Sequence, residues 1–286
     1  MKIILSRKGF DSGTGKVPSP ILPSGELCSL PIPELLPKSC SKQYQEILIG
    51  NNSLGIIVND LTRGKIPPET VAHLDPDLNF ESIPRLKNWQ PIFGQAGAAE
   101  RHLQNNNVNT GDVFIFFGWF KQVEKIAKKY QYIKNAPDLH IIFGWLQIKQ
   151  RIAVDNLSEV PLWGLYHPHC KQNKYAKTDS IYIASEQLKL PNRINNKPGA
   201  GIFKKFHQAL CLTAKDRLRS VWQLPIWFHP QGKNSTLTYH QDFTRWTLKD
   251  DCVLLNSVGR GQEFILDCED YPQALDWLFN LLHLYH

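Results

Sequence analysis

The stretch Val113-Phe114-Ile115-Phe116-Phe117 decides the fold, because five consecutive apolar residues that favour strands leave no polar face for water. A similar stretch, Leu-His-Ile-Ile-Phe-Gly-Trp-Leu-Gln-Ile, runs over residues 139–148. Both runs are too apolar for the exposed edge of a sheet, and they predict buried strands. The two runs share a local pattern, FFGWF and IFGWL. This similarity reflects either a weak internal repeat or two core strands that each carry a glycine kink.

The rest of the chain predicts a mixture of strands and helices around these two runs. Residues 120–132 fit either a helical face or the two arms of a hairpin. Residues 94–106 predict a helix after a glycine entry, and Asp270 begins a C-terminal helix with an apolar face. Further expected elements are strands at 1–5, 160–167 and 180–185, a short helix at 41–50 and a helix start at 67–70. Strands outnumber helices and alternate with them irregularly, so we predict an α+β fold with mixed or antiparallel sheets.

Composition indicates an ordinary globular chain with a basic balance. The 286 residues are 42% hydrophobic, carry a formal net charge of +7 and fit one large domain over 1–286. A basic balance favours polyanionic partners, although net charge alone is weak evidence. The six cysteines form no CxxC pair and are expected to be reduced. We find no apolar run long enough for a signal peptide or a membrane helix, so a cytoplasmic location is expected.

The first candidate site is the loop that follows the N-terminal strand. Arg7 and Lys8 suit phosphate, and Asp11 is the one carboxylate in this Gly-rich segment. Asp11 could therefore act as a base, as a nucleophile or as a stabiliser of a cationic transition state. The alternative is that Asp11 caps a turn while the two cations are solvated.

Two other glycine-containing segments contribute candidates for catalysis and binding. Gln95 and His102 belong to a glycine-led helix start whose free N–H groups can hold an anion, with a capped surface helix as the alternative. In Gly259-Arg260-Gly261-Gln262-Glu263, Arg260 suits a phosphate and Gln262 a base edge, while Glu263 accepts from an amino group or forms a salt bridge. Trp119 would stack on a base if it is exposed, although burial in the core is the more usual state of tryptophan.

Two histidine-containing patterns could form metal sites, and for both another interpretation is favoured. His73-x-Asp75-x-Asp77 could hold a divalent ion, but a short Asp-Pro cluster more commonly forms a turn. His167-Pro168-His169-Cys170 has no CxxC or HxxxH partner nearby, so contact with a substrate is favoured over a zinc site. The sequence therefore predicts neither a metal nor a cofactor.

Several long strings resemble a known family. MKIILSRKGFDSGTGKVPSPILPSGELCSLPIP, HLDPDL, FGQAGAAERHL with GDVFIFFGWF, DLHIIFGWLQI and GRGQEF are similar to the third class of nucleotide modification associated domain, over residues 1 to about 268. The family is named from bacterial and phage gene neighbourhoods that modify DNA bases, so the resemblance implies a link to modified nucleic acid and to phage defence. If the family has a site, the matching positions are Arg7, Lys8, Asp11, Asp75, Asp77, Gln95, Glu100, His102, Arg260, Gln262 and Glu263.

The rhythm of residues 108–150 is also similar to PUA-like barrels, and implies a barrel-like subregion over 88–220. Such barrels commonly hold a flipped or modified base, but likeness of fold carries little functional weight.

Two functions follow as hypotheses. In the first, the chain is a hydrolase, such as a glycosylase, that acts on a base or nucleotide in DNA with Asp11, Gln95 and Glu263 as catalytic residues. In the second, it is a non-catalytic reader that binds a modified base. A small-molecule nucleotide enzyme is a third possibility. In the first two, DNA is the favoured partner, and Arg7, Lys8, Arg260, Gln262, His102 and Trp119 bind it. All of these functions require the N-terminal cations and the turn around Arg260 to meet in one positively charged pocket around Asp11.

Overall fold

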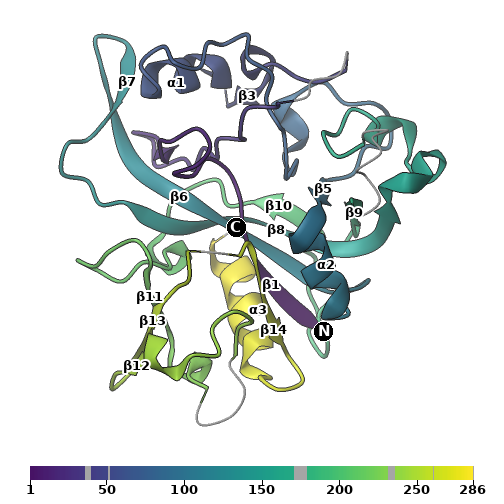
Figure 1. Ribbon diagram of the computed structural model, residues 1–286, viewed down its shortest axis with the longest axis vertical. Helices are drawn as coiled ribbons and strands as arrows, with labels where there is room; N and C mark the ends of the chain where they lie inside the picture. The colour runs from purple at the N-terminus through teal and green to yellow at the C-terminus, as the bar shows by residue number, and fades with distance from the viewer. Residues whose placement is uncertain (36–39, 51, 171–178, 231–235, 260, 286) are drawn as a thin grey trace.

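A large mixed β-sheet forms the centre of the protein (Figure 1). The computed structural model describes residues 1–35, 40–50, 52–170, 179–230, 236–259 and 261–285. The strand order is β14-β1-β6-β8-β9-β5, with β2 and β7 also paired to β6 and β10 paired to β8. The strands of this sheet are β1 (Lys2–Arg7), β2 (Ser19–Ile21), β5 (Ile92–Gln95), β6 (Val113–Ile126), β7 (Lys129–Tyr132), β8 (Leu139–Ala153), β9 (Ser180–Ala184), β10 (Ala200–Ile202) and β14 (Glu263–Asp267).

The two apolar runs are confirmed as central strands. β6 and β8 are antiparallel neighbours, and Phe114 pairs with Leu146. β1 lies parallel to β6 on its other side and antiparallel to β14. Residues 120–132 form the arms of a hairpin and not a helix, because β6 continues to Ile126 and turns into β7. The hairpin turn uses Ala127 and Lys128 with φ angles of 48° and 68°, which match the twist of two-residue hairpin turns.

The barrel-like subregion predicted over 88–220 is wrong, since the described strands form no closed barrel. β5 is the last strand of the sheet path and pairs with β9, while β14 ends the opposite side and pairs with β1. The long strands β6 and β8 change partners along their length instead of curling the sheet onto itself. The resemblance of residues 108–150 to PUA-like barrels therefore predicted the strands correctly, but it did not predict that the sheet stays open.

Two small sheets accompany the large one. The strands β11 (Val221–Pro225), β12 (Trp246–Leu248) and β13 (Cys252–Asn256) are antiparallel, in the order β11-β13-β12. The short strands β3 (Leu48–Ile49) and β4 (Asn52–Ser53) pair with one another.

Three α-helices lie around these sheets within the described residues. They are α1 (Leu54–Leu61), α2 (Gly97–Asn105) and α3 (Gln273–Tyr285). The predictions of α2 and of the C-terminal helix are confirmed. Figure 1 places α1 beside the β6–β7 hairpin at one end and α3 near β11–β13 at the other. No helix among the described residues is long and apolar enough to cross a membrane.

Three of the local predictions are wrong. Residues 41–50 form a short 3-10 turn at Tyr44–Glu46 and then β3, rather than one helix. Residues 67–70 begin no helix, and 160–167 form a 3-10 turn at Leu162–Gly164 instead of a strand. Pro67, Pro68 and Pro161 interrupt the second and third of these segments before a regular element can extend. Residues 41–50 contain no proline, and their turn is held by backbone hydrogen bonds from Tyr44 to Thr70 and from Gln45 to Pro68.

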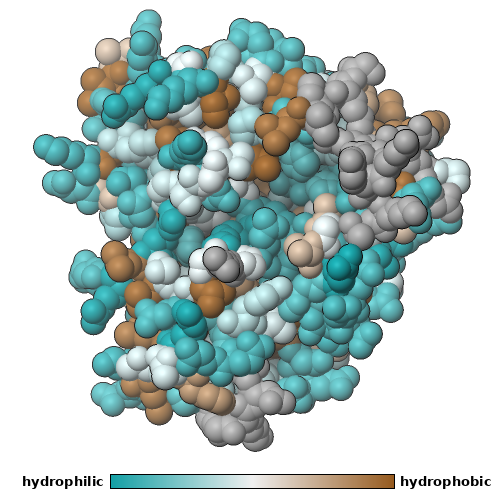
Figure 2. All heavy atoms as spheres, in the orientation of Figure 1, coloured by the Kyte–Doolittle hydropathy of each residue, from teal (hydrophilic) through white to brown (hydrophobic). Residues whose placement is uncertain are grey.

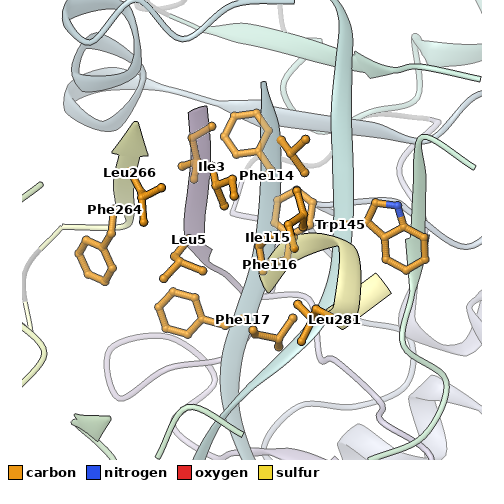
Figure 3. Close-up of a cluster of buried hydrophobic side chains, with 14 of the residues drawn as sticks. Ile3, Leu5, Phe114, Ile115, Phe116, Phe117, Trp145, Phe264, Leu266 and Leu281 are labelled. Carbon is orange, nitrogen blue, oxygen red and sulfur yellow. The ribbon is translucent and has the colours of Figure 1, made fainter. Parts of the chain in front are cut away.

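The main hydrophobic core covers both faces of the central strands. Residues 113–117 are fully buried, and Leu278, Leu281 and Leu282 of α3 pack into the same cluster. Figure 3 shows side chains from β1, β14, β6, β8 and α3 gathered around these strands. A second cluster forms beneath α1 and includes Phe10 and Tyr44. β1 ends at Arg7, and the loop from residue 8 onward crosses toward the second cluster, which contains Phe10.

Candidate functional site

A polar cavity of about 330 Å³ lies at the end of β1. Its wall combines the loop after β1, the end of β5, and segments that lie far apart in the sequence. The lining residues are Arg7, Lys8, Gly9, Phe10, Asp11, Ser12, Thr14, Ile32, His73, Asp75, Gln95, Trp119, His140, His169, Arg219, Gly259 and Gln262. Most of the predicted site residues therefore come together in one place.

Two guanidinium groups give the cavity positive charge. Arg7 donates through Nη2 to the carbonyl oxygens of Gly259, at 2.8 Å, and Gly261. Burial lowers the pKa of Arg7, Arg219 lowers it further, and Asp11 raises it. Arg219 lies 4.2 Å from the centre of the Trp119 ring and forms no ion pair with the described residues. Two close guanidinium groups in a partly buried wall favour an anionic ligand.

A buried polar network holds Lys8 at the cavity. Lys8 Nζ lies 3.1 Å from Glu263 Oε1 and 4.5 Å from the centre of the Phe93 ring. The same Glu263 oxygen accepts from Ser6 Oγ at 3.0 Å and from Gln95 Nε2. Glu263 therefore forms a salt bridge, which is one of the two roles predicted for it. Its Oε2 is buried and has no hydrogen-bond partner among the described residues.

Asp11 adopts the turn-capping arrangement. Its Oδ1 accepts from the backbone N–H groups of Gly13 at 2.7 Å and Thr14 at 2.6 Å, and its side chain is exposed. The loop is held in this shape by Phe10, whose ring leaves no room for a Cβ at residue 15, where φ is +77°. Asp11 therefore lies at the solvent-exposed side of the cavity with one oxygen already bonded.

The predicted nucleic-acid contacts divide into two groups. Arg7, Lys8, Trp119 and Gln262 line the cavity. His102 does not line it, because its Nε2 lies 3.1 Å from Thr238 Oγ1 and its ring packs on Tyr239. Arg260 lies outside the described residues, although both Gly259 and Gln262 line the cavity.

Glu100 lies in a separate buried network. Its Oε1 accepts from Arg151 Nε at 2.8 Å and from Gln104 Nε2 at 2.9 Å, and its Oε2 accepts from Tyr182 Oη at 2.7 Å. It does not line the cavity.

The cavity also contains a group that sequence reasoning did not assemble. His73, Asp75 and His169 present ligand atoms that all lie within 4.8 Å of one another. Asp75 Oδ1 accepts from Gly94 N–H at 2.7 Å and lies 3.2 Å from His167 Nε2. Hydrogen bonds and charge from His167 and His169 hold the pKa of Asp75 well below its usual value despite full burial. Two histidines and a carboxylate in this arrangement are able to hold a divalent metal.

Asp77 does not join that group. It forms a bidentate ion pair with Arg85, with Nη1–Oδ2 at 2.6 Å and Nη2–Oδ1 at 2.7 Å. Tyr166 donates to the same carboxylate, and both charged side chains are almost fully buried. The three residues of the HxDxD pattern therefore do not share a face, and Asp77 is structural.

Arg219 and His140 are further cavity residues that the sequence did not identify. Burial lowers the pKa of His140 to about 3, and Trp222 Nε1 donates to its Nδ1 at 2.9 Å. His140 is thus a neutral acceptor at neutral pH. Arg219 lies in an ordinary polar segment, KDRLRS, that carries no motif.

The fold and the cavity define an α+β protein with a site suited to an anionic ligand. Residues 2–267 match the family described as nucleotide modification associated domain 3, so the chain belongs to that family. The resemblance found in the sequence is thereby confirmed over nearly the whole chain. No curated protein and no solved structure is significantly similar to the chain.

Proposed function

We propose that this protein binds a nucleotide unit of modified DNA in the cavity and hydrolyses a bond within it. The observation that carries the proposal is the convergence of Arg7, Lys8 and Arg219 on one cavity. Three cations suit a phosphate, and Gln262 supplies both a donor and an acceptor for a base edge. Membership of the nucleotide modification family supports the same class of ligand.

The size of the cavity favours one nucleotide over a paired duplex. A volume of about 330 Å³ lies at the lower end of small-ligand sites. Enzymes that act on a base take it out of the stack, so the substrate would be single-stranded or flipped. Figure 2 shows a mostly hydrophilic face with apolar side chains in small, scattered groups, which fits a polar partner.

The bond we assign is the glycosidic bond, with Asp11 as the carboxylate that stabilises the sugar cation or activates water. Water would replace the base at the sugar C1′, and the base would leave with a proton. Glu263 would act through Lys8, with which it forms an ion pair, and Gln95 would act by donating a hydrogen bond to Glu263.

A non-catalytic reader is the second candidate. It is favoured by one observation, that Asp11 is exposed and already uses Oδ1 to cap its own turn. A reader needs the cations and Gln262, but no carboxylate.

The test combines binding with product analysis. Oligonucleotides with unmodified cytosine, 5-hydroxymethylcytosine or 5-hydroxymethyluracil, single-stranded and duplex, are titrated against the protein at several salt concentrations. We expect Arg219→Ala to weaken binding and to reduce the salt slope by about one. The matched control is Arg193→Ala, since Arg193 pairs with Asp276 and does not line the cavity.

Mass spectrometry of the incubated oligonucleotides then separates the two candidates. A free base and an abasic sugar that disappear in Asp11→Asn support the hydrolase. Salt-dependent binding with chemically unchanged DNA supports the reader. Binding that is absent, or that Arg219→Ala leaves unaltered, would contradict both.

A further inference from the structure

Three ligand atoms from two distant segments meet at one side of the cavity. They are His73 Nε2, His169 Nε2 and an oxygen of Asp75. His73 and Asp75 come from one loop, while His169 comes from a segment almost a hundred residues later. All three residues line the cavity, so a group bound between them would face its interior.

The spacing of these atoms fits a shared ion. The Nε2 atoms of His73 and His169 lie 3.3 Å apart, and Asp75 Oδ2 lies 3.7 Å from His169 Nε2. Two nitrogens held at about 2.0–2.1 Å by one tetrahedral ion lie about 3.3–3.4 Å apart. A direct hydrogen bond between the two imidazoles would give a similar distance, so the experiment has to separate the two arrangements.

Two of the three ligands are held by a second partner on the side away from the shared space. Glu34 Oε2 lies 2.8 Å from His73 Nδ1, which therefore carries the proton and leaves Nε2 of a neutral ring as the electron-pair donor. Asp75 uses Oδ1 for the Gly94 N–H and for His167, and this leaves Oδ2 toward His169. A carboxylate behind a ligand histidine is the usual outer partner of metal sites.

The backbone also makes room for His169. An added Cβ at Gly94 would lie 2.4 Å from the ring carbons Cγ and Cδ2 of His169. Only a glycine at this point of β5 lets the imidazole pack so closely on the strand. The position of the ring is thus set by the sheet and not by the loop alone.

We propose that the protein binds one divalent transition-metal ion, Zn²⁺ or Fe²⁺, through His73 Nε2, His169 Nε2 and Asp75 Oδ2. Two nitrogens and one oxygen match catalytic zinc sites and the facial triad of non-haem iron. The two carboxylates, Glu34 and Asp75, would balance the double positive charge of the ion. The remaining coordination positions face the cavity, where a bound ion would act as a Lewis acid or activate water. The inference concerns the ion and does not depend on the nucleic-acid function.

The experiment measures metal directly on the full-length chain. Protein purified without chelators or a metal-affinity tag is analysed by mass spectrometry for elements, and about one Zn or Fe per chain is expected. The apoprotein, made by dialysis against dipicolinate, is then titrated with Zn²⁺, with Fe²⁺ under anaerobic conditions, and with Co²⁺ for its visible spectrum.

Variants identify the ligands. His73→Ala and His169→Ala are expected to lose the ion, and Glu34→Gln to weaken binding by about 10–100-fold. The matched control, His283→Ala, removes an exposed histidine from α3 and should bind as the wild type does. Far-UV circular dichroism checks that each variant is folded.

Two outcomes would overturn the proposal. One is a folded wild-type protein that binds none of the three ions even in the micromolar range. The other is equal binding by wild type, His73→Ala and His169→Ala, which would mean an adventitious ion. If the alanine variants do not fold, the wild-type Co²⁺ complex decides, because hyperfine-shifted proton signals from two imidazoles require ligation by histidine.

Discussion

Loss of the Asp77 carboxylate charge is expected to destabilise the protein without affecting the proposed metal ligand Asp75 two residues away. In the folded protein Asp77 is 1% exposed and Arg85 2% exposed, and they are joined by two hydrogen bonds. The substitution Asp77→Asn keeps the shape and removes the charge. The Arg85 guanidinium would then be buried without its counter-ion.

The magnitude follows from what Arg85 retains. Removing one partner of a buried ion pair costs about 3–5 kcal/mol. Arg85 keeps a hydrogen bond to Ser82 Oγ at 2.9 Å and its contact with the Trp89 ring, 3.9 Å from the ring centre. These contacts still stabilise the cation, so we expect a loss of about 3 kcal/mol in the free energy of unfolding.

The assay is urea unfolding at neutral pH, compared with Glu186→Gln. Glu186 pairs with Lys149 at the surface, where the two side chains are 76% and 47% exposed, and its loss should cost less than about 1 kcal/mol. Similar, small losses for both variants would refute the reasoning. Folded Asp77→Asn should also bind Zn²⁺ as the wild type does, whereas Asp75→Asn should not.

Two further predictions concern His169 and the buried histidines. Gly94→Ala should displace the His169 ring and lower Zn²⁺ affinity more than tenfold in calorimetric titration, while Gly259→Ala, where an added Cβ meets nothing within 4 Å, should not. Burial lowers the pKa of His140 to about 3 and of His240 to about 4, so the unfolded chain takes up these protons first as pH falls below about 6.5. Urea unfolding should therefore show a free energy of unfolding that falls between pH 6.5 and 4, by up to about 1.4 kcal/mol per pH unit for each histidine, and a flat profile would contradict this.

Local pattern was enough to predict the central strands and the terminal helix. The run at 113–117 is apolar on both faces because both faces of β6 are covered, and the leucines of α3 repeat at helical spacing. Pattern failed at 41–50, where a short turn is held by backbone hydrogen bonds to residues 68–70, and at 160–167, where Pro161 precedes a turn closed by local hydrogen bonds. Whether a sheet closes into a barrel depends on the pairing of its two edge strands, and the sequence of a single strand does not determine that pairing. The barrel prediction was wrong for this reason.

The candidate site was predictable only in part. Arg7, Lys8, Gln95 and Gln262 belong to motif-like strings and do line the cavity. The pairing of His73 with His169 depends on a contact across 96 residues, and no spacing rule reaches that far. The alternate spacing of Asp75 and Asp77 did not place them in one site, since Asp77 pairs with Arg85.

The place of β1 between β6 and β14 has a consequence for how the molecule is made. β1 cannot acquire its antiparallel neighbour until residues 263–267 have been synthesised. Glu263, on that late strand, is also the counter-ion of Lys8. Contacts of such long sequence separation slow folding. A nascent chain should therefore not complete the Lys8 side of the cavity until residues 263–267 have left the ribosome.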